Sequence, residues 1–408
     1  MRTGHRDPLR RDLQALVPLH HRPRLPAAPS RAYRRPLRHV PVGCFFRCWS
    51  ESRRVGFTET RTSSSSSRNA TASPVAKTIG SFMSRNAEHL ESFEPVVSRG
   101  GLVLFRRDAD SERGWSRARE QRRLCLRNPV TGWCRSIPAP TVNDQAHVLL
   151  AGEDGRSFHL VAVNLEPLRR YGDLSFQAFT SAEAEDTHGS KATHDGGAWG
   201  PVIELSPPED FEKVVNPTPV VLGRVAHWLF RSYGAYNVLA LDVHTARTAC
   251  IDLPPESALD SDEIPRNQML LSSTTDGRLS LLAGEETRIS VWALTTPAAT
   301  TTTTEEGPAG GGSNCGWSLH AAYEREWIAG FVQPRGGARR KPGCPVIELL
   351  RSGGEGGGAV FMRVHGFGSC YVLLNMETNE IVPTEVPVSC ICPYEVDLAL
   401  LTAPMKPF

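Results

Sequence analysis

One hairpin-forming stretch constrains the fold of this chain more than any other feature. Between Arg123 and Pro140, an alternating apolar run leads to a turn with Asn128, Thr131 and Gly132, and a second short run ends in prolines. An Asn side chain caps such a turn, and a glycine that follows it adopts positive φ without strain. The stretch therefore predicts a β-hairpin with these three residues as structural turn residues.

The same pattern returns at two later positions. Asp242 and Thr245 mark the second copy, and Asn375 and Thr378 mark the third, each between two apolar runs. A hairpin repeated along one chain indicates a repeat architecture. We interpret the spacing of the copies as intervals of about three repeats each.

Short apolar runs and turn signals continue from residue 95 to the end. Asp276-Gly277 is a strong hairpin signal, and the 35 glycines and 31 prolines favour short strands over long helices. The strands divide into six units, at residues 96–140, 146–203, 218–255, 267–297, 315–350 and 358–402. Units of roughly 40 residues are typical of propeller blades. We therefore expect an all-β fold, a β-propeller of about six or seven blades built from short antiparallel strands.

Two segments late in the chain complete this prediction. The apolar run Trp327–Val332 is interpreted as a strand, and Leu398–Leu401 as a last strand that returns to close the ring. Closure is expected because an open array of blades would leave sheet edges exposed.

The sequence predicts three parts. Residues 1–61 are rich in arginine and proline and contain no lysine, which indicates a disordered or weakly helical basic segment or a degenerate domain remnant. Residues 62–94 are a serine-rich linker followed by a short helix, and residues 95–408 are the propeller. An organelle transit peptide in residues 1–61 is the less favoured alternative, because prolines interrupt the amphipathic helix that it needs.

Charge, hydropathy and cysteine usage exclude several function classes. A net charge of +2 gives no general argument for nucleic acid as a partner, and no apolar run approaches the length of a membrane helix. Four of the ten cysteines, Cys125, Cys134, Cys250 and Cys370, lie in apolar runs or their hairpin returns, and the close pairs Cys44/Cys48 and Cys390/Cys392 lack the spacing of a structural zinc site. We expect reduced thiols and an intracellular location, in the cytoplasm or nucleus.

No catalytic constellation emerges from the sequence. GxSxG, P-loop, HExxH and GxGxxG motifs are absent, so we assign no catalytic, cofactor-binding or metal-binding residue and expect no enzymatic activity. The His-containing acidic stretch Glu183–Gly197 is interpreted as a loop, and His227 as a packed strand residue. Trp133, next to the first turn, is a candidate partner-binding residue.

Several stretches resemble a known family. LCLRNPVTGWCRSIPAP, PVVLGRVAHWLFRSYGAYNVLALDVHTARTACIDLPP and LLSSTTDGRLSLLAGEETRISVWAL are similar to segments of the F-box-associated propeller domains of plant F-box proteins, in the large grass branch. The resemblance covers about residues 95–400. In that family an N-terminal F-box binds the Skp-type adaptor of a cullin–RING ubiquitin ligase, and the propeller captures the substrate.

The resemblance implies a non-enzymatic protein-interaction module, the substrate-recognition part of a ubiquitin-ligase adaptor. Its partners would be a substrate protein and, where a functional F-box exists, the Skp-type adaptor. Residues 1–61 lack the Leu-Pro-x-Glu-Leu-like opening of an F-box, so the F-box is missing or degenerate here. Two alternatives remain open: a free-standing propeller scaffold without a ligase role, and a propeller enzyme with a site in its central channel.

Overall fold

A computed structural model gives the fold of this chain. It describes residues 39–47, 54–59, 73–107, 123–152, 156–165, 174–181, 197–205, 211–232, 235–254, 268–295, 316–332, 345–353, 358–366, 368–384 and 390–397. All of them belong to one unit of the chain, residues 36–408. The predicted loop at Glu183–Gly197 and the predicted last strand at Leu398–Leu401 lie largely or wholly outside the described residues.

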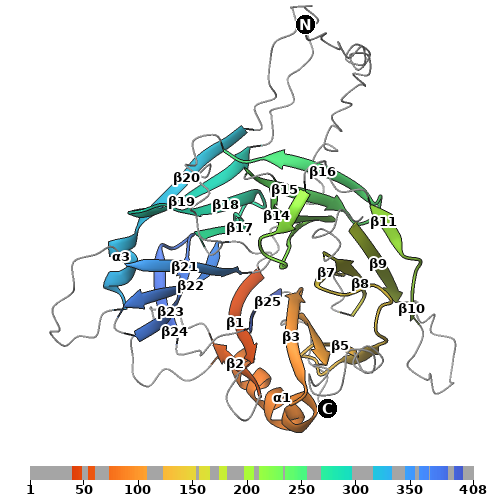
Figure 1. The fold of residues 1–408 in the computed structure, drawn as a ribbon. Coiled ribbons are helices and arrows are strands. Elements are labelled where there is room, and N and C mark those ends of the chain that lie inside the picture. The colour runs from red at the N-terminus through yellow and green to blue at the C-terminus, as the bar shows by residue number, and fades with distance from the viewer. Residues whose placement is uncertain are drawn as a thin grey trace, which may run out of the picture. The chain divides into compact units, whose positions relative to one another are not determined.

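The described strands form six antiparallel sheets arranged around a common centre, which confirms the predicted β-propeller and sets its blade number at six (Figure 1). Each blade starts at the centre and adds strands outward, as expected for a radial repeat. The first three blades consist of β3 (Phe93–Arg99), β4 (Leu102–Arg107), β5 (Leu124–Arg127) and β6 (Cys134–Ile137); β7 (Ala146–Ala151), β8 (Phe158–Asn164), β9 (Leu174–Ser181), β10 (Gly197–Trp199) and β11 (Ile203–Leu205); and β12 (Phe211–Val214), β13 (Val220–Leu222), β14 (Val225–Ser232), β15 (Ala235–Asp242) and β16 (Arg247–Asp252).

The other three blades complete the ring. They consist of β17 (Met269–Ser273), β18 (Leu279–Gly284), β19 (Arg288–Thr295) and β20 (Gly316–Glu324); β21 (Val346–Ser352), β22 (Ala359–Gly366), β23 (Gly368–Asn375) and β24 (Glu380–Thr384); and β25 (Cys390–Asp397), β1 (His39–Arg47) and β2 (Val55–Glu59). We number these blades 1 to 6 in this order.

The apolar core of the ring lies between neighbouring blades. Strands buried on both faces, such as β4, β17 and β18, contribute side chains to the interfaces on either side. One buried cluster joins blades 4 and 5 through residues such as Leu282, Val291 and Met362, and similar clusters fill the other interfaces. Each blade therefore depends on both neighbours to bury its apolar side chains.

The ring is closed by pairing between the two ends of the unit. β1 pairs antiparallel with β25, so Phe45 lies opposite Cys392 and Arg47 opposite Cys390. In Figure 1 these strands lie side by side although they come from opposite ends of the colour scale. The fully buried Phe45 ring contacts Tyr394 edge-on, with 5.3 Å between centroids, and Phe105 of blade 1 at 5.8 Å.

This closure corrects the predicted domain boundaries. The sequence predicted a disordered or weakly helical segment over residues 1–61 and a propeller that starts at residue 95. Instead, His39–Arg47 and Val55–Glu59 are strands of blade 6. The physical reason is that a strand from outside the repeat covers the edge that β25 would otherwise expose.

The predicted short helix is present as α1 (Pro74–Leu90), and it packs on the closing blade. The Ser73 hydroxyl accepts a hydrogen bond from the Ala76 amide at 3.1 Å, and Pro74 stands at the helix start, where it is tolerated. Ile79, Phe82 and Leu90 are buried in the cluster that contains Phe45 and Phe105. The helix therefore belongs to the core between blades 6 and 1 rather than to a linker.

The spacing of the three repeated turns also needs correction. They join β5 to β6, β15 to β16 and β23 to β24, so they lie in blades 1, 3 and 5, two blades apart rather than three. Blades 2 and 4 have longer segments at this point of the sheet, between residues 181 and 197 and between residues 295 and 316. The predicted unit 315–350 also divides differently, because Gly316–Glu324 completes blade 4 and blade 5 begins at Val346.

We predict that Phe45→Ala destabilises the whole propeller. Removing a fully buried phenylalanine from the closing interface should lower the free energy of unfolding by about 3–5 kcal/mol. The measurement is the urea midpoint of the full-length protein by tryptophan fluorescence. Leu319→Ala, at a side chain that is 50% exposed on β20, is the matched control and should leave the midpoint almost unchanged. Equal midpoints for both variants would contradict the closing role of β1.

Candidate functional site

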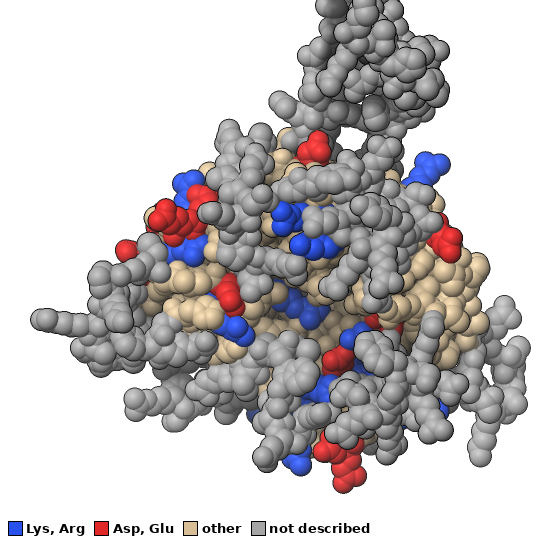
Figure 2. Space-filling view, in the orientation of Figure 1, with Lys and Arg blue, Asp and Glu red and all other residues tan. Residues whose placement is uncertain are grey.

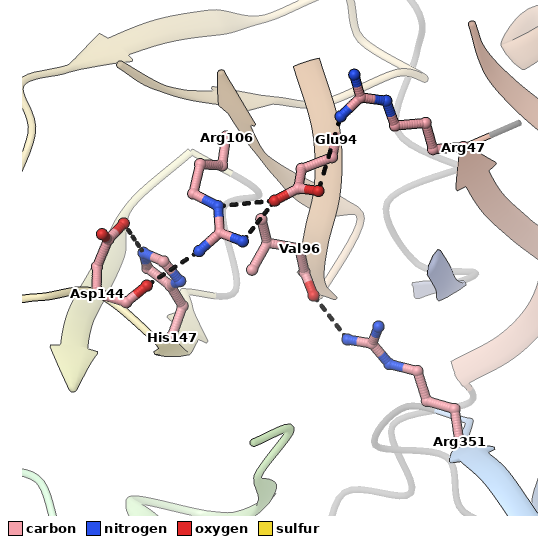
Figure 3. A network of polar contacts seen from close by, with 7 residues as sticks. All are labelled: Arg47, Glu94, Val96, Arg106, Asp144, His147 and Arg351. Carbon is pink, nitrogen blue, oxygen red and sulfur yellow. Dashed lines mark hydrogen bonds and ion pairs between the residues drawn. The ribbon is translucent and has the colours of Figure 1, made fainter. Parts of the chain in front are cut away.

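A network of charged side chains connects the beginnings of blades 1 and 2 with blade 6 (Figure 3). Glu94 on β3 accepts a hydrogen bond from Arg106 Nε at 2.8 Å, and Arg47 Nη1 lies 3.8 Å from its other carboxylate oxygen. Arg106 Nη1 donates to the backbone oxygen of Asp144 at 3.0 Å. We call Arg47, Glu94, Arg106, Asp144 and His147 the polar network.

Asp144 and His147 form the buried end of this network. His147 Nε2 lies 3.3 Å from Asp144 Oδ2, and both side chains are almost fully buried. Burial lowers the pKa of His147, and the neighbouring Asp144 opposes this only in part. The pair therefore favours a neutral imidazole.

The polar network is better suited to holding blades together than to chemistry. Glu94 is held between two guanidinium groups, and Arg106 is divided between Glu94 and the Asp144 backbone. A general base or nucleophile must reach a substrate, whereas Arg47, Asp144 and His147 are closed off from solvent. The contacts cross from blade 6 to blade 1 and from blade 1 to blade 2, next to the closing pair of strands.

Two further arginines bridge inner strands across the ring. Arg351 of blade 5 donates to the backbone oxygen of Val96 in blade 1 at 2.6 Å and to that of Ile391 in blade 6. Arg99 of blade 1 donates to the Val221 oxygen of blade 3 at 3.2 Å. Burial lowers the pKa of Arg99 to about 10, and nearby Glu395 opposes the shift, so the guanidinium stays charged at neutral pH.

The centre of the ring is consequently occupied by guanidinium groups bound to backbone carbonyls. Figure 2 shows basic and acidic side chains next to one another around the hollow in the middle of this face. A small, mostly apolar cavity between blades 5 and 6 is lined by Gly43, Phe361, Leu373 and Tyr394, with Glu395 as its acidic side chain. Among the described residues, neither feature brings together a nucleophile, a base and an oxyanion donor.

A second titratable cluster lies on blade 5 and is partly open to solvent. Glu348, Arg363 and Tyr371 are paired in register across β21, β22 and β23, and His365 lies two residues beyond Arg363 on the same face. Arg363 donates to Glu348 at 3.1 Å and to the Tyr371 hydroxyl at 3.1 Å, while His365 Nε2 lies 3.2 Å from Glu348. We call these four residues the polar row.

The polar row offers an acid, an imidazole and a phenol within reach of solvent. The side chains of Glu348, Arg363 and His365 are 22%, 30% and 35% exposed. Glu348 is already shared by Arg363 and His365, and the guanidinium lies over the Tyr371 ring, 5.3 Å from its centroid. The row can hydrogen-bond a polar ligand, but its carboxylate is engaged by its own neighbours.

An exposed aromatic surface follows blade 4. After β20, the chain forms the short helix α3 (Arg325–Gly330), and Tyr323, Trp327 and Phe331 lie at successive spacings of four residues. Trp327 stacks on Tyr323 at 5.9 Å between centroids and meets Phe331 edge-on at 5.2 Å. Trp327 is 38% exposed and Phe331 47% exposed. We call Trp327 and Phe331 the aromatic surface; the buried Tyr323 ring supports Trp327 from below.

The sequence missed this surface because it assigned Trp327–Val332 to a strand. The structure begins a helix at Arg325, and this prediction is wrong. A usable signal was present, since a spacing of four residues between aromatic side chains places them on one face of a helix.

The predicted turn residues adopt the expected conformations. Asn128 Oδ1 accepts hydrogen bonds from the Val130 and Thr131 amides, both at 3.1 Å, and Gly132 has φ of +75°. Asp242 accepts from the His244 and Thr245 amides, and Asn375 from the Glu377 and Thr378 amides, in the same way. The positive-φ position falls on Ala246 and Asn379 in the second and third copies.

The remaining predicted residues lie apart from one another. Gly277 has φ of +78° and donates to the Thr274 oxygen at 2.9 Å, so Asp276-Gly277 forms the turn from β17 to β18. Trp133 is half-buried and meets Phe158 of blade 2 edge-on at 6.2 Å between centroids. His227 is buried on β14, with Nδ1 3.1 Å from the Val220 oxygen, and burial lowers its pKa to about 4. The structure does not bring these residues together into one site.

The described residues offer neither a membrane-spanning helix nor a cluster of metal ligands. No helix among them is long and apolar enough to cross a membrane. Across the same ranges, no group of three or more His, Cys, Asp and Glu side chains could hold a metal ion.

The fold and these sites define a six-bladed β-propeller with an internally paired centre and an exposed aromatic surface. The chain belongs to the family described as "Domain of unknown function (DUF7595)", whose model matches residues 56–408. No curated protein matches the chain.

Several solved structures are similar in outline. A periplasmic gluconolactonase of Pseudomonas aeruginosa, PpgL, is 12% identical with a TM-score of 0.37, over 84% of this chain and 82% of that chain. The polysaccharide lyase Uly1 is 10% identical with a TM-score of 0.34, over 72% of each chain. A protein from Lactobacillus plantarum is 6% identical with a TM-score of 0.33, over 85% of this chain and 82% of that chain. Similarities this remote carry no argument about function.

We predict that Asn128→Ala lowers the free energy of unfolding by about 1–2 kcal/mol, because two amides lose a shared acceptor at a side chain that is 3% exposed. Asn375→Ala removes the same pair of bonds at an exposed turn and should cost less, since water replaces the lost acceptor. The measurement is the urea midpoint of each variant. A normal midpoint together with lost partner binding in Asn128→Ala would show that this turn is a binding site.

Proposed function

We propose that this protein is a non-enzymatic protein-interaction module that binds its partner through the aromatic surface beside blade 4. The observation that carries the proposal is the exposed, edge-on pair of Trp327 and Phe331 on a folded support. Large aromatic side chains on a fixed surface supply much of the affinity at protein interfaces.

The support beneath these rings is well anchored. Ile328 and Ala329 are buried in the cluster between blades 4 and 5. The Arg325 amide donates to the Thr287 oxygen at 2.8 Å, and the Arg325 side chain is buried. A partner would therefore meet a preformed surface, which lowers the entropic cost of binding.

The flanking charge favours a particular kind of partner. Glu324 and Glu326 are both exposed, on either side of the buried Arg325. A segment with an apolar anchor and basic neighbours would satisfy both the rings and these carboxylates. The proposed partner is a protein segment of this chemistry, in the cytoplasm or nucleus.

The resemblance to F-box-associated propellers supports a more specific role. In that role the propeller captures a substrate protein for a cullin–RING ubiquitin ligase, and a functional F-box would bind the Skp-type adaptor. The test is titration of the purified full-length chain with a purified Skp-type adaptor. Binding supports the ligase role, whereas a folded chain that does not bind supports a free-standing interaction scaffold.

The polar row supports a second candidate, a propeller enzyme. Glu348 and His365 are the partly exposed acid and imidazole that such a site would use. The hydrogen bond between Glu348 and Arg363 makes this candidate weaker than the interaction module, because the carboxylate is already engaged.

We predict that Trp327→Ala weakens partner binding by roughly 30-fold or more while leaving the fold intact, as expected for an aromatic hot spot. The partner is first identified by cross-linking to the wild-type protein, and its purified form is then titrated against each variant by calorimetry. Val202→Ala is the matched control, because Val202 is an exposed apolar side chain, 45% exposed, in blade 2. Equal affinity of the Trp327→Ala, Phe331→Ala and control variants would overturn the proposed surface.

A further inference from the structure

Two cysteine sulfurs lie in contact across the first repeated hairpin. Cys125 is on β5 and Cys134 on β6, and their Sγ atoms are 3.5 Å apart. Cys125 pairs in register with Ser136, and Cys134 lies two residues before Ser136. Both thiols therefore project from the same face of the hairpin, at diagonal positions.

The two thiols differ in their access to solvent. Cys134 is exposed, whereas Cys125 is buried in the cluster between blades 6 and 1. The contact with Cys134 and burial raise the pKa of the Cys125 thiol. An oxidant that reaches this pair from solvent consequently meets Cys134 first.

Other contacts hold the buried thiol in place. Arg127 Nε lies 3.2 Å from Cys125 Sγ, and Arg127 Nη1 donates to Asn86 of α1 at 2.5 Å. The same guanidinium lies over the Phe82 ring at 5.8 Å from the centroid. Cys125 is thus fixed between the hairpin and α1, so it is positioned to react with a modified neighbour.

We propose that Cys125 and Cys134 are a reversible redox site that forms a disulfide when the protein meets a peroxide. The Cys134 thiolate attacks one peroxide oxygen, the O–O bond breaks, and hydroxide leaves to become water. The Cys125 sulfur then attacks the resulting sulfenic acid, the S–O bond breaks, and a second water leaves with the Cys125 proton. Two thiols are oxidised and one hydrogen peroxide is reduced to two waters.

The geometry requires only a local adjustment. A disulfide has an S–S distance of about 2.05 Å, so the sulfurs must approach by roughly 1.5 Å. Because the two cysteines occupy diagonal positions, the exposed Cys134 side chain supplies part of this movement and a shift of the two hairpin strands supplies the rest. The turn residue Asn128 holds the two strands together in both redox states, because its bonds lie outside the thiol contact.

Tryptic mapping tests this site directly. Arg123, Arg127 and Arg135 place Cys125 and Cys134 in two separate peptides, residues 124–127 and 128–135. The folded full-length protein is treated with hydrogen peroxide at one to ten equivalents, alkylated in denaturant and digested without reductant. We expect the two peptides to appear joined, two alkylation sites to be lost, and dithiothreitol to restore both.

Two variants make the result interpretable. Cys134→Ser removes the exposed thiol and should abolish the joined peptide, leaving Cys125 available for alkylation. Cys250→Ser, at another exposed cysteine on β16, should form the joined peptide normally. The proposal is overturned if Cys134 is driven to sulfinic acid while Cys125 stays alkylatable, or if Cys134 joins a cysteine other than Cys125.

Discussion

The pairing of β1 with β25 is the contact on which the rest of the structure depends. It joins the two ends of the unit. By pairing with β25, β1 completes the sixth blade and closes the ring. Phe45 and Tyr394 fill the interface, and α1 covers it from the outside. The polar network crosses the same region, where Arg47 of β1 meets Glu94 of β3. Closure therefore combines strand pairing, aromatic packing and buried ion pairs at one place.

The closed ring also determines which residues are available for function. Titratable groups near the centre bind one another or the backbone of another blade, as Glu94, Arg99 and Arg351 do. Connections between blades are less constrained, and one of them forms α3 with its exposed rings. Paired charges at the centre and exposed rings at the periphery favour recognition at the periphery over catalysis at the centre. This contrast underlies the proposed interaction module.

Local signals predicted the blades well and their closure poorly. Asn128, Asp242 and Asn375 each form the turn that their neighbours predict, because these hydrogen bonds reach only two or three residues along the chain. Whether residues 39–47 form a strand depends on pairing with β25, about 350 residues away in the sequence, and no local pattern encodes such a pairing. Its surroundings of arginine and proline also masked a short apolar run. The sequence did not predict the polar row either, because Glu348 and Arg363 meet only through the pairing of two strands.

Hydrogen exchange of the β1 segment tests ring closure most directly. The amides of residues 43–47 lie on a strand paired with both β2 and β25 and should exchange as slowly as those of β3 and β4, by orders of magnitude more slowly than an unstructured peptide. The measurement is deuterium uptake in peptides that cover these strands, followed by mass spectrometry in the full-length protein. Uptake within seconds in residues 43–47, with β3 and β4 still protected, would contradict a propeller closed by its N-terminal strand.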